Sequence, residues 1–175
     1  WLDGLPAELI AAPAVGSRLW ASGLVLSAAV SACGPSSPLL ANTYPSAHAA
    51  AVAVLDGLER RDTTTLRALA LTEQEFRDHV WPELPASRPE RNLPFSYVWG
   101  DLHQKSEQAL AATVARHGGQ RFTLVAVRFA GETSPYPSYT VHRETVLEVR
   151  DGSGAPAAIR LFGSLIEHER AWKVF

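Results

Sequence analysis

The chain has 175 residues, 16 of them Lys or Arg and 18 Asp or Glu, which leaves a formal net charge of −2. A near-neutral chain lacks the clustered basic face that usually marks a nucleic-acid-binding protein, so we expect no nucleic-acid partner. The single cysteine excludes an intramolecular disulfide, and the sequence contains no CxxC, HExxH, G-x-S-x-G or glycine-rich phosphate loop.

An apolar segment near the N-terminus predicts an export leader. Arg18 precedes the apolar residues 19–29, and the small residues Ser31 and Ala32 follow them. A basic residue, an apolar stretch of about 7–15 residues and small residues before a cleavage site are the marks of a secretory signal peptide. The stretch is also shorter than the roughly 20 apolar residues that an ordinary membrane span needs. We therefore expect a signal helix that ends the leader formed by residues 1–33.

The end of this leader resembles the lipobox of bacterial lipoproteins. It reads Val30-Ser31-Ala32-Cys33 and contains the only cysteine of the chain. The resemblance implies that Cys33 is lipidated, so that the protein is anchored in a membrane of the bacterial cell envelope and faces the periplasm. Gly34 stands where lipoproteins retained in the inner membrane often carry Asp, which favours the outer membrane. The alternative is a buried helix in which the cysteine is a small apolar residue.

Two segments, residues 1–16 and 34–46, lie on either side of the predicted signal sequence, and we expect neither to belong to the globular domain. Residues 1–16 include Asp3 and Glu8, which are unusual ahead of a leader, and we interpret them as sequence upstream of the natural start. Residues 34–46 are rich in proline and serine. Such a run is stiff and has little to bury, so we expect a tether between the membrane and the domain.

The globular domain is expected to span residues 47–175 and to begin with two helices. Ser46 can cap a helix that runs to about Arg61, along which apolar residues recur with helical spacing. A cap at Asp62 or Thr63 then predicts a short second helix.

Two further helices are expected before the first strand. Thr72 and Glu75 form the capping-box pattern, in which the Thr hydroxyl and the Glu carboxylate each accept a free backbone N–H. The pattern predicts a third helix over 73–80, which ends there because the residue before Pro82 avoids the helical region. After a loop with several prolines, the apolar spacing predicts a long helix over 95–116.

The apolar period changes from 3.6 to 2 after the long helix, which predicts strands. The alternation indicates strands over 121–130, 139–150 and 157–168, with a turn at 151–154, and a fourth strand that begins at Trp172. Because the chain stops soon afterwards, we interpret this last strand as truncated, with an unpaired edge. The order of elements predicts an α+β fold, in which N-terminal helices pack on one curved antiparallel sheet of about four strands.

The run from Ala51 to Leu69, with Asp62 at its turn, resembles the opening of nuclear-transport-factor-2-like domains. In these domains, whose cone fold is shared with polyketide-cyclase-like proteins, a long helix and a short Leu-bearing helix precede a curved sheet. The resemblance implies a cone-like fold that often binds a small apolar ligand and is in a few cases an enzyme. The chain departs from the family pattern over 73–94, where the family often has a strand.

His142 and Glu144 are the candidates for catalysis. They lie two residues apart in the predicted strand over 139–150, so both side chains would point to the same face. A histidine beside a carboxylate can act as a general base near neutral pH. The alternative, which we favour, is the ordinary polar face of a half-solvated sheet. Asp101 and His103 lie on different sides of the long helix, and we expect both to be solvated.

Four aromatic residues are candidates for a pocket mouth, namely Trp81, Phe95, Tyr97 and Trp99, although core packing is the simpler expectation. The scattered histidines have no metal-ligand spacing, so we expect neither a metal nor a cofactor. The core is expected between the long helix and the sheet, where Val98, Trp99, Leu102, Ala109 and Leu110 would face Val125, Val127, Leu147 and Leu161.

Together these features predict a membrane-anchored envelope lipoprotein, lipidated at Cys33, whose α+β domain is a non-catalytic module. Its partner would be a small apolar ligand or an envelope protein. The alternative is a cone-fold isomerase or cyclase that acts on a small apolar substrate through His142 or Glu144.

Overall fold

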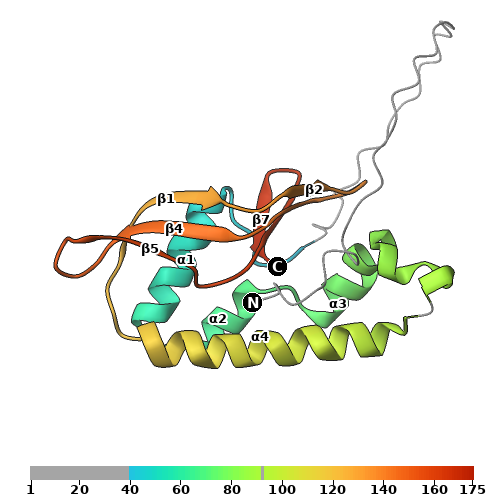
Figure 1. Ribbon diagram of the computed structural model, residues 1–175, viewed down its shortest axis with the longest axis horizontal. Helices are drawn as coiled ribbons and strands as arrows, with labels where there is room; N and C mark the ends of the chain where they lie inside the picture. Colours follow the sequence, from blue (N-terminus) through green and yellow to red (C-terminus); the bar gives the residue numbers. More distant parts are fainter. Residues whose placement is uncertain (1–39, 92) are drawn as a thin grey trace, which may run out of the picture.

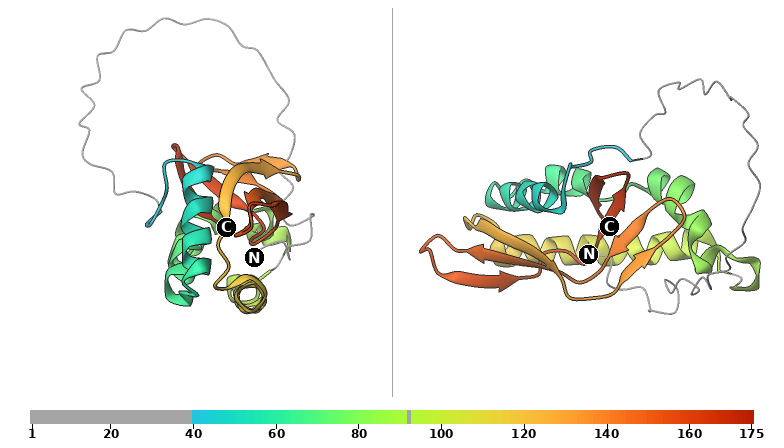
Figure 2. Two further views of the ribbon diagram at one scale, coloured as in Figure 1. Left: turned by 90° about the vertical axis from the view of Figure 1, so that its left-hand side faces the viewer. Right: turned by 90° about the horizontal axis from the view of Figure 1, so that it is seen from above.

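The computed structural model describes residues 40–91 and 93–175, so the leader, with the predicted lipidation at Cys33, lies outside the described residues (Figure 1). Helices come first in the chain and strands afterwards, which confirms the α+β class. The long helix α4 (Phe95–His117) extends along one side of the molecule, and the strands lie along the opposite side. A view down α4 shows the same arrangement (Figure 2).

The first two helices begin at the expected caps. Helix α1 (Ala47–Glu59) starts after Ser46, whose hydroxyl accepts a hydrogen bond from the backbone N–H of Ala49. Helix α2 (Thr63–Leu69) starts after Asp62, whose carboxylate accepts one from the backbone N–H of Thr65. Each cap satisfies a backbone donor that the first helical turn leaves free.

The third helix is confirmed at its start and is less regular than expected further along. In α3 (Glu73–Glu75) both hydrogen bonds of the capping box between Thr72 and Glu75 are present. The chain continues as a π-helical turn, η2 (Phe76–Val80). Three 3₁₀ turns then carry it through the proline-rich loop to α4, namely η3 (Trp81–Glu83), η4 (Pro85–Ser87) and η5 (Pro89–Arg91).

The strands form two antiparallel sheets rather than one. One sheet has the order β1-β4-β5, with β1 (Thr123–Phe129), β4 (Thr145–Arg150) and β5 (Pro156–Ile159). The other has the order β2-β3-β6-β7, with β2 (Thr133–Pro135), β3 (Thr140–His142), β6 (Leu165–His168) and β7 (Ala171–Val174).

Two of the long predicted strands are therefore wrong. Each is divided into two shorter strands, one in each sheet. The strand expected over 139–150 breaks at Arg143 and Glu144, where Glu144 has a φ of 52° and leaves the extended conformation. The strand expected over 157–168 breaks between β5 and β6. The alternation hides the first break because Val141 and Thr145, an even number of residues apart, are both buried.

A bulge in β1 reverses the predicted position of Val125. The pairing of β1 with β4 shifts register between Leu124 and Ala126. Such an extra residue rotates the strand, so the side chains before and after it no longer keep a single alternation. Leu124 and Val127 pack against the core, whereas Val125 is 55% exposed. The expectation that Val125 faces the long helix is wrong for this reason.

The interior consists of two apolar clusters. The first lies under α1, α2 and the C-terminal half of α4, and it includes Leu110, Leu147 and Leu161. The second joins η2, the proline-rich turns and the N-terminal half of α4 to the four-stranded sheet, and it includes Val98 and Leu102. The predicted helix residues Val98, Leu102 and Leu110 are thus buried, but the first two do not share a cluster with Leu147.

Residues 40–46 belong to the folded domain, which corrects the expectation that the tether extends to residue 46. Leu40 is buried in the second cluster. Tyr44 and Trp172 exchange two backbone hydrogen bonds, with N–O distances of 2.8 and 2.7 Å. A further bridge joins Ala70 to Val174, so the edge of β7 that was expected to be unpaired is covered.

Candidate functional site

His142 lies at the end of β3, in close contact with a carboxylate other than the expected one. Its Nε2 atom is 2.9 Å from Oε2 of Glu167 on β6. Its ring lies 4.7 Å, between centroids, from both Phe129 and Trp172, whose own rings are 6.2 Å apart and nearly parallel. The side chain of His142 is only 14% exposed. The imidazole is therefore part of a three-ring cluster and is largely shielded from solvent.

Glu144 does not join His142. Because the strand ends before it and its φ is positive, its side chain is directed elsewhere and contacts Arg160 at 3.3 Å between Oε2 and Nη1. The expectation that the two side chains share one strand face is wrong, since the strand on which it depended is interrupted between them.

A cavity of about 340 Å³ lies between α2, the start of α3, α4 and β7, and we call it the α2–α4 groove. Its apolar lining consists of Ala70, Leu71, Trp99, Val174 and Phe175. Its polar lining consists of Arg67, Thr72, Glu73, His103, Ser106 and Glu107. The size and the combination of an apolar lining with a few polar groups are typical of small-molecule sites.

Stacked rings form one wall of the groove. The ring of His103 stacks on that of Trp99, with a centroid distance of 5.8 Å and an interplanar angle of 18°. Phe76 supports this wall from the core, because its ring lies 5.4 Å from Trp99 and 6.4 Å from Phe175. His103 is solvent-exposed, as expected, and it is nevertheless part of the groove.

The other aromatic candidates do not line the groove. Trp81 and Phe95 pack edge to face at a centroid distance of 5.7 Å and both contact Phe76, so they belong to the core. Tyr97 is 68% exposed on α4. Of the four residues considered for a pocket mouth, only Trp99 contributes to this groove.

An ion pair joins the two helices at the groove. Nε of Arg67 on α2 donates to both carboxylate oxygens of Glu107 on α4, at 2.9 and 3.1 Å, and Nη2 donates at 2.8 Å. The hydrogen bond from Arg67 holds the pKa of Glu107 below its usual value, and the same hydrogen bond raises the pKa of Arg67. Glu73 in turn contacts Arg77 at 2.6 Å.

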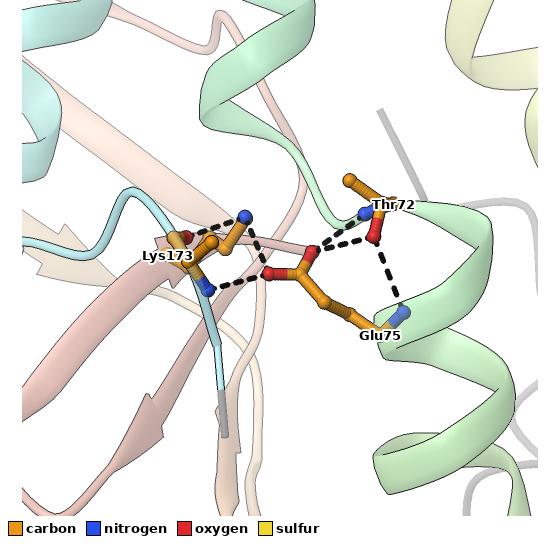
Figure 3. A network of polar contacts seen from close by, with 4 residues as sticks. Thr72, Glu75 and Lys173 are labelled. Carbon is orange, nitrogen blue, oxygen red and sulfur yellow. Dashed lines mark hydrogen bonds and ion pairs between the residues drawn. The ribbon is translucent and has the colours of Figure 1, made fainter. Parts of the chain in front are cut away.

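A buried polar network adjoins the groove through Thr72, which belongs to both (Figure 3). The fully buried Lys173 donates from Nζ to Oε1 of Glu75 at 2.9 Å and to the carbonyl oxygen of Ala41 at 2.7 Å. The backbone N–H of Ala41 donates to the same Glu75 oxygen at 2.7 Å. The other oxygen, Oε2, accepts from the backbone N–H and hydroxyl of Thr72 at 2.8 and 3.0 Å. The network thus joins three distant segments.

The charge state of Glu75 follows from these contacts. Burial raises the pKa of its carboxyl group, but hydrogen bonds from Thr72, Lys173 and Ala41 favour the ionised form more strongly. The net effect is a pKa below the usual value for glutamate. Glu75 is therefore a carboxylate at neutral pH, paired with the ammonium group of Lys173.

Sequence reasoning found Glu75 as a capping residue but missed its partner Lys173 and the pair of Arg67 and Glu107. Residues 98 apart in the first pair and 40 apart in the second meet only through the tertiary fold. The one local signal for the groove was the helical spacing of Trp99, His103 and Glu107, which places all three on one side of α4.

Comparison of the chain with protein-family models, curated proteins and solved structures finds no match. Within residues 40–91 and 93–175, no three His, Cys, Asp or Glu side chains gather as metal ligands would. In the same part of the chain, no helix combines the length and apolar character that crossing a membrane requires.

Proposed function

We propose that the protein is a lipid-anchored envelope lipoprotein whose α+β domain binds a small ligand without catalysing a reaction. The α2–α4 groove is the observation that carries this proposal. It offers an apolar interior with aromatic walls and a polar rim, which is the usual composition of a small-molecule site.

The polar groups of the groove support binding rather than catalysis. Arg67 and Glu107 satisfy each other through three hydrogen bonds, and His103 stacks on Trp99 instead of contacting a carboxylate that could orient it. A general acid or base needs a group that is held in reach of a transferable proton. These side chains serve better to shape and orient a bound molecule.

The proposed anchor is the lipid on Cys33, which the lipobox-like residues before it support. Leu40, the first described residue, is buried in the domain, and residues 34–39 lie between it and Cys33 in the sequence. A chain of that length spans at most about 25 Å when fully extended. The domain would therefore stay close to the surface of the membrane, with the outer membrane as the proposed location.

For the fold, we propose the cone architecture of nuclear-transport-factor-2-like domains. The order of helices first, the last of them long, and then antiparallel strands supports it. The breaks that divide the strands between two sheets are compatible with a sharply curved sheet, since bends and bulges are how strands turn corners.

The alternative enzyme would now depend on His142 and Glu167, because Glu144 is directed away. Their 2.9 Å contact resembles an oriented imidazole–carboxylate pair. However, the His142 side chain is only 14% exposed and packs against Phe129 and Trp172, which leaves little room for a substrate. We therefore favour the binding function.

A ligand screen tests the proposed function. Small molecules are screened by thermal shift, and hits are followed by the NMR signal of the Trp99 indole N–H. We expect hits to perturb this signal, and Trp99→Ala to weaken their binding at least about tenfold, because the aromatic wall is lost. Tyr97→Ala, an exposed aromatic on the same helix, is the matched control. If hits bind equally well to Trp99→Ala, the groove is not their site.

A further inference from the structure

The charges around the α2–α4 groove are internally balanced. Its lining contains three side chains that carry a formal charge, Arg67, Glu73 and Glu107. Arg67 and Glu107 form an ion pair at 2.8 Å, and Glu73 pairs with Arg77 at 2.6 Å. Each of these charges therefore already has a partner of opposite sign.

This balance disfavours an ionic ligand. An anion that binds here must compete with Glu107 for Arg67, and a cation must compete with Arg67 for Glu107. Either ion also loses hydration when it enters a partly apolar cavity, and this loss is costly unless a new charge partner replaces the water. The groove offers no such partner without breaking a pair of its own.

The shape of the wall favours a flat ring. The rings of Trp99 and His103 are nearly parallel, at 18°, and stack on each other, so another flat ring can extend the stack or meet its edge. Aromatic rings prefer offset stacking or edge-to-face contact with one another. Beside this wall, the hydroxyl of Ser106 and the imidazole of His103 are groups that can donate or accept a hydrogen bond.

We infer that the α2–α4 groove binds an uncharged, planar aromatic molecule with one hydroxyl or carbonyl group at its edge. The inference rests on the proposed binding function and names the class of ligand. Stacking against Trp99 supplies the apolar contact, and the edge group contacts the polar rim. The closed pair of Arg67 and Glu107 selects against charged analogues of the same ring.

Three probes with one ring system and different charges test the inference. They are 2-naphthol, which is neutral at pH 7, 2-naphthoate, which is anionic, and 2-naphthylmethylammonium, which is cationic. Dissociation constants are measured at pH 7 by NMR titration of the Trp99 indole signal. We expect the neutral probe to bind about tenfold more tightly than either ion, a difference equivalent to about 1.4 kcal/mol.

Opening the ion pair should change this preference in a defined direction. Glu107→Gln leaves Arg67 without its carboxylate and is expected to raise the affinity for naphthoate about tenfold. Arg67→Gln leaves Glu107 unpaired and should instead favour the cation. Lys105→Gln removes a positive charge outside the groove, from a pair with Asp101, and should leave the order of the three probes unchanged. Thermal melting of each variant verifies that it is folded.

The outcomes separate this inference from the proposed function. If an ionic probe binds the unaltered protein as well as naphthol does, or if Glu107→Gln does not shift the preference towards the anion, the inference is wrong while the binding function stands. If neither the three probes nor any molecule of the broader screen perturbs the Trp99 signal, the proposed function fails as well.

Discussion

At the scale of single residues, the burial of Lys173 is the most consequential feature. An ammonium group is almost never fully buried unless it is paired, because it loses its hydration. Lys173 compensates through Glu75 and the carbonyl of Ala41, and Glu75 compensates through Thr72 and the N–H of Ala41. The pair therefore holds α3, β7 and the first residues of the domain together (Figure 3).

Replacement of Lys173 by Met should lower the free energy of unfolding by about 3–5 kcal/mol, since Glu75 would remain buried without its cation. In the double variant with Glu75→Gln, the loss should be smaller than the sum of the two single losses, because the residues interact directly. Urea unfolding measures all three variants. Lys105→Met, which breaks the exposed pair with Asp101, should cost less than about 1 kcal/mol. Equal losses for Lys105→Met and Lys173→Met would contradict this account.

The same network predicts how stability depends on pH. Because the pKa of Glu75 is lower in the folded state than its usual value, its ionisation stabilises the fold at pH values above the unfolded-state pKa of about 4.3. This contribution disappears as the pH falls through the folded-state value. We expect the unfolding free energy of the unaltered protein to decrease more steeply below about pH 4.5 than that of Glu75→Gln. Parallel curves for the two proteins over this range would show that Glu75 makes no such contribution.

At the scale of elements, α4 is divided between the two apolar clusters. Leu102, in its N-terminal half, packs in the cluster that contains Phe76 and Phe175, whereas Leu110 packs with Leu147. The next residue after Leu102, His103, faces the groove and solvent. One helix thus connects both halves of the core and supplies a wall of the groove with its adjoining face.

Leu102→Ala should destabilise the protein by about 2–5 kcal/mol through lost burial and a residual cavity. His103→Ala, one position away, should cost less than about 1 kcal/mol because its side chain is exposed. Thermal and urea unfolding compare the two. If His103→Ala unfolds the protein while Leu102→Ala melts like the parent, the orientation of α4 described here is wrong.

At the scale of the whole molecule, few residues separate the proposed lipid anchor at Cys33 from the part of the chain that packs in the domain. Leu40 is buried, Ala41 hydrogen bonds to the network of Lys173, and Tyr44 pairs with β7. The first described residues are thus integrated into the fold, and the lipid would act on the position of the domain rather than on its stability.

Cys33→Ala should release the protein from the membrane fraction and abolish incorporation of labelled fatty acid, with the melting temperature of the domain unchanged. Replacement of another small residue next to the site, Gly34→Ala, is the control and should leave lipidation intact. Continued labelling of Cys33→Ala would refute lipidation at this position, whatever the location of the protein.

The sequence by itself determined the features that depend on neighbouring residues. The caps at Ser46, Asp62 and Thr72 and the long helix after Pro94 were predicted closely, because helix ends are set by side chains within a few positions of the backbone groups they satisfy. The change to strands after α4 was also visible, since an apolar period of 2 is a local pattern.

Only the tertiary structure decided where the strands break and which polar groups meet. The left-handed conformation of Glu144 and the bulge at Val125 both lie in segments whose apolar residues alternate as in an unbroken strand. The apolar pattern therefore cannot reveal either of them. The pairs formed by Lys173 with Glu75 and by Arg67 with Glu107 join residues far apart in the chain. Such contacts depend on how whole elements pack, which no local pattern encodes, and both the α2–α4 groove and its balanced charge arise from that packing.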